Sequence, residues 1–404
     1  MNATKAMTLL AAVAVGLSAQ ALTLAVKDVK IAQRYPWNGL VDIDYTVECD
    51  DPDADVYVYP VGYDVDMNLS VPPRTLMGDG ANGKAVKAGT HRMTWDMAKD
   101  MGENYNRAKF SMKVHAYAGA APYMVIDLSA GSNAEKYEVS YMSEMPDTEW
   151  PVEYKTTKLV LKLIPPGTFT MGSPKTEYDA YVYSYSYHGY EYEHKVTLTQ
   201  PFYCSVFEIT GQQRALIMGG TSSDYNAYCG FSYNDLRGST LGAKWPEHQQ
   251  VDATSFLGKL RSRTGVTFDL PTEAQWEYVC RAWDYSRISS MNPNAFGVYN
   301  MNKLPAEWCL DWFKSDLGTS PATDPKGPTT GSIRCIRGGV YTRYRSGTSY
   351  TNGYDTRTAA RVYRNYNQND IYPSWNYYYG TSSSPSGTDG SYFGCRLVAL
   401  PAAK

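Results

Sequence analysis

Apolar and polar residues alternate along the first part of the chain. The segments VDIDYTVE (41–48) and KFSMKVHAY (109–117) place an apolar residue at every second position. Period two with one apolar face is typical of strands that bury one side. Turn clusters, DDPDAD and GDGANGK, separate such runs at the spacing of a sandwich. The pattern predicts an all-β, immunoglobulin-like sandwich over residues 22–120, which would serve as a spacer or adhesion module.

A transition, residues 121–155, separates this part from a longer second domain. In it, MVIDLSAG and YEVSYM have the pattern of strands and are compatible with either neighbour, whereas SEMPDTEWP indicates a linker. From residue 156 onward the chain is rich in Gly and aromatic residues, with few long periodic runs. We therefore treat residues 156–404 as one domain.

Helical spacing and cap residues predict three helices in the second domain. One covers 251–265, with Gly265 as its stop signal, and another covers 271–283, opening near Thr272. A short third helix is expected within 206–220.

The first residues have the pattern of a secretory signal. Lys5 precedes an apolar run over residues 7–17, and an A-x-A site ends at Ala21. We expect a signal peptide over residues 1–21 and an exported protein, in the periplasm, at the cell surface or secreted. An N-terminal buried helix is the alternative. No later stretch approaches the roughly 20 apolar residues of a membrane span.

Charge and residue counts narrow the classes of function. A formal net charge of −3 gives no electrostatic footprint for nucleic acid. The seven cysteines contain no C-x-x-C pair and the five histidines no H-x-x-x-H group, so we expect no metal centre. The chain has 36 Tyr against 10 Phe. That bias indicates aromatic surface with a polar edge toward water.

Four motifs follow one another in the second domain. They are LIPPGTFTMGS (163–173), FDLPTEAQWEYVCRA (268–282), CIRGGVY (335–341) and FGCRLV (393–398). In this order they resemble the formylglycine-generating enzyme (sulfatase-modifying factor) family. The resemblance covers essentially everything after the transition and implies an α+β domain with a variant of the C-type lectin-like fold.

The catalytic residues of that family are missing from the matching interval. Its enzymes resemble one another in two copper(I)-binding cysteines after the R-G-G motif, but residues 340–361 contain no cysteine. Residues 300–308 also depart from the family's calcium-associated motif. The resemblance therefore implies no catalytic residue, no metal and no cofactor. An oxidoreductase with other ligands is the alternative. The thiols near that region are Cys309, Cys335 and Cys395.

Several charged residues of the motifs are expected to be structural. Arg337 precedes two glycines that suit a tight, buried corner. Glu273, Glu277 and Arg281 are spaced four apart on one predicted helix, as in a charge ladder. Further arginines at framework positions of the resemblance are Arg361, Arg364 and Arg396.

Residues 340–392, the second tyrosine-rich segment, contain eleven tyrosines and no Lys or Glu. Tyr, Trp and Arg with few Lys and Glu is typical of a protein-recognition surface. Tyr among Ser, Gly and Asn is typical of a paratope. The segment also resembles the variable regions of proteins diversified by diversity-generating retroelements. A fixed tyrosine-rich loop is the alternative, and both predict binding.

Residues 178–192, the first tyrosine-rich segment, contain seven tyrosines in fifteen positions. The tyrosines mostly alternate with small or polar residues, so a hairpin would place Tyr181, Tyr183, Tyr185 and Tyr187 on one face. We expect this segment to pack beside the second one or extend it. A loop with exposed tyrosines is the alternative.

These observations predict an exported, non-catalytic protein that binds a protein or carbohydrate ligand. Besides the oxidoreductase, a purely structural envelope component is a further alternative. The predicted ligand-binding residues are Tyr344, Arg345, Tyr350, Tyr354, Tyr366, Tyr372, Trp375, Tyr377, Tyr378, Tyr379, Tyr183, Tyr185 and Tyr187.

Overall fold

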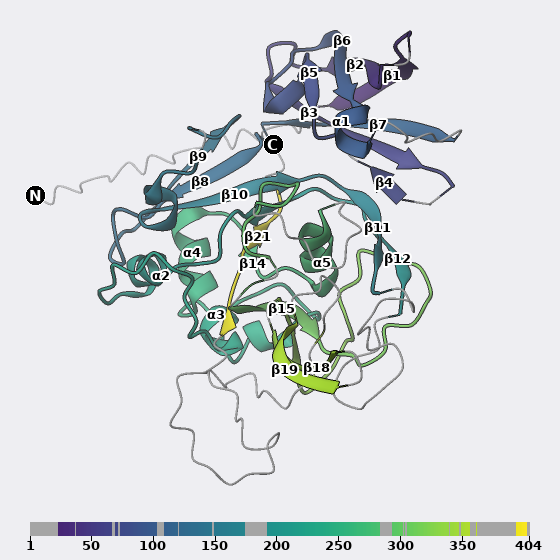
Figure 1. Ribbon diagram of the computed structural model, residues 1–404. Helices are drawn as coiled ribbons and strands as arrows, with labels where there is room; N and C mark the ends of the chain where they lie inside the picture. The colour runs from purple at the N-terminus through teal and green to yellow at the C-terminus, as the bar shows by residue number, and fades with distance from the viewer. Residues whose placement is uncertain are drawn as a thin grey trace, which may run out of the picture.

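The computed structural model has two domains, one above the other in Figure 1. It describes residues 23–36, 38–66, 69–71, 73–102, 109–119, 121–147, 149–173, 192–282, 293–301, 303, 305–338, 340–346, 349–355, 361 and 393–401.

The N-terminal domain consists of two antiparallel sheets that enclose one core. The first sheet contains, in spatial order, β1 (Leu24–Gln33), β2 (Leu40–Cys49), β6 (Gly89–Asp96) and β5 (Leu76–Gly78). The second contains β4 (Leu69–Val71), β3 (Val56–Asp64) and β7 (Phe110–Ala118), and short helices η1 (Ala81–Gly83) and α1 (Met97–Met101) complete the domain. The predicted alternation is confirmed in β2, where Ile43, Tyr45 and Val47 are buried and the residues between them are partly exposed.

The second domain is built on a six-stranded sheet that gathers distant parts of the chain. In spatial order its strands are β14 (Phe268–Asp269), β21 (Val398–Ala399), β13 (Phe202–Ser205), β10 (Lys158–Ile164), β8 (Tyr123–Asp127) and β9 (Glu138–Met142). β8 and β9, the two strands of the predicted transition, therefore pair with the second domain.

Three smaller sheets complete this domain. One contains β11 (Gly167–Met171), β12 (His194–Leu198) and β16 (Ala322–Thr323), and another β17 (Arg334–Arg337), β15 (Ala306–Trp312) and β20 (Phe393–Gly394). The third is the hairpin of β18 (Val340–Ser346) and β19 (Ser349–Asp355). It lies on the side of the second domain that is remote from the N-terminal domain (Figure 1).

The three expected helices are present; the short one lies within 206–220 as expected, and the other two are shorter than predicted. They are α2 (Gly211–Met218), α4 (Phe256–Thr264) and α5 (Glu273–Arg281). α4 begins after Ser255, whose side chain accepts a hydrogen bond from the Gly258 amide, and ends at Gly265 with φ 72°. Thr272 caps α5 in the same way, within a capping box. The sequence pattern did not predict the short helix α3 (Tyr233–Arg237), and η2 (Val152–Lys155) and η3 (Gly242–Lys244) are single turns.

Within the described residues, no helix is long and apolar enough to cross a bilayer.

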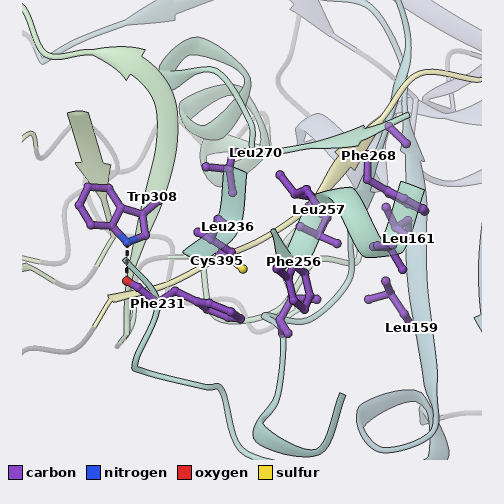
Figure 2. Packing of buried hydrophobic residues seen from close by; sticks show 14 of the residues in the cluster. Leu159, Leu161, Phe231, Leu236, Phe256, Leu257, Phe268, Leu270, Trp308 and Cys395 are labelled. Atoms are coloured by element: carbon purple, nitrogen blue, oxygen red, sulfur yellow. Dashed lines mark hydrogen bonds between the residues drawn. The ribbon is translucent and has the colours of Figure 1, made fainter. Parts of the chain in front are cut away.

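The main core of the second domain lies between the six-stranded sheet and the helices. Figure 2 shows Leu159 and Leu161 of β10 beside Phe256 and Leu257 of α4. Trp308 of β15 is fully buried at the other end, where its indole nitrogen donates a 2.8 Å hydrogen bond to the carbonyl oxygen of residue 231. Because this bond satisfies the indole, the large ring can be buried without leaving a polar atom unpaired.

The two domains are joined by direct contacts. The backbone amide of Thr168 in β11 donates a 2.8 Å hydrogen bond to the hydroxyl of Ser70 in β4. Tyr59 and Tyr117 of the N-terminal domain pack against the core of the second domain. The N-terminal domain therefore contacts the β10 and β11 side of its neighbour, away from the β18–β19 hairpin (Figure 1).

Candidate functional site

The β18–β19 hairpin contains four of the predicted ligand-binding residues. The strands pair antiparallel, with Arg345 opposite Tyr350 and Tyr354 opposite Tyr341, whereas Tyr344 occupies the register position between these pairs. Directly opposite residues of an antiparallel pair are close enough to act together. The pairing therefore brings Tyr344, Arg345, Tyr350 and Tyr354, which the sequence spreads over eleven positions, into one two-stranded unit.

The other predicted ligand-binding residues lie outside the described residues. They are Tyr366, Tyr372, Trp375, Tyr377, Tyr378, Tyr379, Tyr183, Tyr185 and Tyr187. The two strands that flank the first tyrosine-rich segment, β11 and β12, are paired, and Ser173 bridges to Tyr192. The segment therefore falls between two paired strands.

Arg337 forms the buried corner from which the hairpin leaves the fold. Its guanidinium is fully buried, donates a hydrogen bond to Glu277 of α5, and lies 3.8 Å from the carboxylate of Glu273. The next residue, Gly338, has φ 86°, and a Cβ there would lie 3.1 Å from the carbonyl oxygen of Met301. Glycine is required at this corner on both counts. The predicted tight corner is confirmed.

Glu277 also holds the start of the first tyrosine-rich insertion. One of its oxygens accepts a 2.9 Å hydrogen bond from the backbone amide of Gly172. Arg281, four residues along the helix, pairs with the same carboxylate at 2.7 Å and donates to the Gly172 carbonyl. Since Arg337 binds the other oxygen of Glu277, both tyrosine-rich segments leave the fold next to one buried carboxylate. The predicted ladder is structural, as expected.

Arg361 and Arg396 fix two later points of the second segment. Arg361 pairs with Glu273 of α5 at 2.9 Å and donates to the carbonyl of Lys314. Arg396 pairs with Glu307 of β15 at 2.9 Å, where β20 returns the chain to the fold. Both arginines are buried. The framework role predicted for them is confirmed, whereas Arg364 lies outside the described residues.

These buried carboxylates remain ionised because arginines surround them. Burial alone would raise the pKa of Glu273, but the charges of Arg361 and Arg337 lower it to about 2. Burial likewise opposes ionisation of Glu277, and Arg281 and Arg337 lower its pKa. The network is thus fixed in one charge state over the ordinary pH range, which suits a permanent anchor.

The buried residue Asp311 behaves differently. Burial and the charge of Glu273 raise its pKa to about 7, although the carboxylate accepts a 2.7 Å hydrogen bond from the Glu273 amide. Asp311 and Glu307 both belong to the EWCLDW segment, whose charged residues received no role from the sequence alone. Two acidic residues in an otherwise apolar strand were the available signal, because buried acids need partners.

The thiols of the alternative oxidoreductase do not fit a copper(I) site. Cys309 and Cys335 lie on the paired strands β15 and β17 and are fully buried, and burial raises the pKa of each thiol. Burial also raises the pKa of Cys395. Copper(I) binds thiolates, so thiols kept protonated in an apolar core are poor ligands. Across the described ranges, no three His, Cys, Asp or Glu side chains are placed to hold a metal ion.

Parts of the chain are similar to known proteins. Residues 151–287 match the family model of the sulfatase-modifying factor enzyme 1-like domain. A formylglycine-generating enzyme of Streptomyces coelicolor is 26% identical over 275 residues, covering 49% of this chain and 82% of the enzyme. One of Thermomonospora curvata is 41% identical over 79 residues, covering 19% of this chain and 24% of the enzyme. A serine/threonine-protein kinase pkn1 of Chlamydia pneumoniae is 27% identical over 216 residues. That match covers 44% of this chain and 32% of the kinase.

Proposed function

The chain contains a domain of the formylglycine-generating enzyme family, and we propose that it uses this domain for recognition rather than catalysis. In this proposal the protein is exported and binds a protein or carbohydrate ligand through its two tyrosine-rich segments. The observation that carries the proposal is Glu277, whose two oxygens bind Gly172 and Arg337, residues that shortly precede the first and the second segment.

This arrangement gives the two segments a common origin on a rigid element. α5 lies in the interior of the domain, and its two glutamates bind Arg337, Arg361 and Gly172. Recognition loops carried by a rigid frame are a frequent solution, because the frame limits the entropy lost when the loops bind. Composition supports the same use, since Tyr with small polar residues supplies rigid contact area and adaptable hydrogen bonds.

The domain arrangement agrees with this use. The β18–β19 hairpin lies on the side of the second domain remote from the N-terminal domain (Figure 1). We propose that an immunoglobulin-like N-terminal sandwich acts as a spacer and that the second domain is a C-type lectin-like variant. The hairpin would then face outward, away from the spacer. The expected signal peptide would place the protein in the periplasm, at the cell surface or outside the cell.

An oxidoreductase is the second candidate. It is favoured by the match to the Streptomyces coelicolor enzyme, which extends over 82% of that protein. The interval after Arg337 opposes it, because it lacks cysteine, and so do the protonated thiols of the core. Incubation of the full chain and copper(I) with a cysteine-containing peptide, under air so that dioxygen can act as the oxidant, tests this activity by mass spectrometry. Conversion of the cysteine to formylglycine would reject the recognition proposal.

Binding is tested on the hairpin itself. The full chain is applied to glycan arrays and to a displayed library of surface-protein domains, beside a variant with Tyr344, Arg345, Tyr350 and Tyr354 changed to alanine. We expect saturable binding by the parent chain. The variant should bind with an affinity at least about tenfold lower, as when central aromatic contacts are removed from an interface. Tyr225→Ala, at an exposed tyrosine outside both segments, is the control. Equal saturable binding by all three proteins would place the binding site outside the hairpin, and no saturable binding by any of them would favour a structural envelope component.

Diversification of the second segment is tested by population sequencing. Amplicons covering codons 335–400 from the native population should show substitutions concentrated at tyrosine and asparagine codons. Codons for Arg337, Gly338 and Arg396 should be constant, because the first two form the buried corner and the third is fully buried. A clonal result would leave a fixed binding surface.

A further inference from the structure

A cavity of about 370 Å³ lies between the two domains. The N-terminal domain contributes Tyr59 and Pro60 to its wall, and the second domain contributes Lys162, Tyr123 and Phe296. Its volume is in the range of small-molecule sites, and its wall is mostly apolar and aromatic. Clefts between domains are a common place for such sites.

Lys162 is the unusual residue of this wall. It lies in β10 between Leu161 and Leu163, which are buried in the main core, so that its side chain occupies the opposite face of the sheet. Its ammonium group lies 4.0 Å from the ring centroid of Tyr123. Within the described part of the chain, this cation–π contact is the only interaction of the ammonium, which forms no hydrogen bond or ion pair there.

The cavity wall contains two other charged residues, Arg74 and Glu144. Arg74 is a second cation, and it donates a 2.6 Å hydrogen bond to the carbonyl oxygen of Asp100. Glu144 lines the cavity but forms no ion pair with Lys162 within the described residues. Burial lowers the pKa of Lys162 to about 8. The half-buried ammonium thus lines a mostly apolar cavity, where the aromatic face of Tyr123 is its contact within the described protein.

We propose that this cavity binds a small organic acid, with the carboxylate on Lys162 and an apolar or aromatic body between Tyr59, Tyr123 and Phe296. One flexible ammonium supplies a point charge that suits a monoanion, whereas a phosphate is usually held by several donors or a bidentate arginine. Arg74, the arginine of this cavity, is already engaged. The apolar wall provides the remaining contact area.

Such a ligand would contact both domains at once. Tyr59 belongs to β3 of the N-terminal domain and Lys162 to β10 of the second, so the bound acid would add a contact to their junction. Binding would also be linked to protonation, because the carboxylate favours the charged lysine. Tyr59 and Tyr123 face the same space, and their pKa values are raised by burial, so they remain neutral where Lys162 titrates.

The test uses the full chain and matched ligand pairs. 3-Phenylpropionate and its neutral amide are compared first, followed by further acid–amide pairs of about 8 to 16 non-hydrogen atoms. Binding is measured by isothermal titration calorimetry and ligand-observed NMR at pH 7 and pH 9. We expect an acid to bind and its amide to bind at least about tenfold more weakly. With the Lys162 pKa near 8, the affinity for the acid should fall about tenfold between these pH values.

Two variants assign the effect to the lysine. Lys162→Met keeps the length and apolar stem of the side chain and should abolish the preference for the acid. Lys162→Arg keeps a cation that does not titrate near pH 8, so it should bind the acid with little change between pH 7 and pH 9. Lys113→Met, at an exposed lysine of β7, is the control. Equal binding of acid and amide, full binding by Lys162→Met, or no binding by any acid of the series would each overturn the proposal.

Discussion

The two domains use the same kinds of charged pairs in opposite ways. In the N-terminal domain, Arg92 and Asp44 join neighbouring strands at the surface, with 60% and 35% of their side chains exposed. In the second domain, Arg396 and Glu307 form a pair with 0% and 1% exposed. Both pairs join an arginine to a carboxylate, so the environment decides what each pair does. A surface pair is screened by water and salt, whereas a buried pair has no alternative partner.

The buried pairs lie where tyrosine-rich segments join the fold. Arg337, Arg361 and Arg396 mark the start, an internal point and the end of the second segment, and each is bound to a glutamate of α5 or β15. Buried ion pairs are weak evidence for net stability, because desolvation offsets much of the Coulomb attraction. Their common position instead supports a role in orientation. They attach the chain to α5 and β15 at three points, which holds these points in one geometry.

The largest expected effect is that of Glu277→Gln. The substitution keeps the shape of the side chain but removes the carboxylate that Arg337 contacts directly, leaving that of Glu273 at 3.8 Å. Removing one member of a buried pair typically costs about 3–5 kcal/mol in the free energy of unfolding. Hydrogen exchange of peptides covering residues 273–281 measures this locally. It avoids the assumption that both domains unfold together.

The double variant Glu277→Gln/Arg337→Met separates orientation from stability. It removes the stranded cation and should recover much of the lost free energy of unfolding, because an apolar replacement of a buried pair is often tolerated. Ligand binding should stay impaired, since Gly172 and Arg337 would no longer share one partner. A Glu277→Gln variant as stable as the parent would contradict the anchoring role of the network.

Asp311 provides the second largest expected effect, and it depends on pH. Its pKa in the folded protein is about 7, above the usual value of 3.8, so the folded state holds a proton that the unfolded state has lost between these values. The folded state therefore binds more protons in this window, and stability falls as the pH rises from about 4 to about 7. Asp311→Asn, which can still accept from the Glu273 amide, removes this loss.

The measurement is a pair of urea titrations across that window. We expect Asp311→Asn to gain about 2–4 kcal/mol relative to the parent between pH 4 and pH 7, from the size of the pKa difference. Glu273→Gln would test the cause, because loss of that negative charge should lower the pKa of Asp311. Parallel stability curves for parent and Asp311→Asn would show that Asp311 is ionised normally.

Local signals made much of the frame predictable. Thr272 sets the start of α5, because its side chain accepts a hydrogen bond from a backbone amide of the first turn. Gly265 ends α4, because glycine adopts the positive φ found there. Gly338 belongs to a motif for which a tight corner was expected, and its positive φ is the backbone conformation that glycine favours. The lengths of α4 and α5 were overestimated, because apolar spacing continues past the cap residues. Caps decide where a helix starts, and periodicity shows only that one exists.

Contacts between distant parts of the chain were not predictable. Lys162 stands in the strand pattern KLVLKLI as an ordinary outward-facing lysine, and only the docking of the N-terminal domain places it in a cavity. Cys309 and Cys335 meet because β15 and β17 pair with an irregular register. Neither fact has a local signature, since domain docking and strand register depend on residues far away. The contacts of Glu277 with Gly172 and Arg337 also join distant parts of the chain and were not predictable.

The smallest expected effect is that of Asp44→Asn, which completes the comparison between the domains. The pair with Arg92 has good geometry, with a second hydrogen bond of 2.8 Å, and the arginine lowers the pKa of Asp44. Yet water surrounds both groups, so the hydrogen bonds gained in the folded state are nearly matched by hydration in the unfolded state. At 0.15 M salt we expect no change outside the error of a urea titration, and a small loss of stability only at low ionic strength. A salt-independent loss of stability as large as that of Glu277→Gln would contradict this comparison, because burial would then not distinguish the surface pair from the buried one.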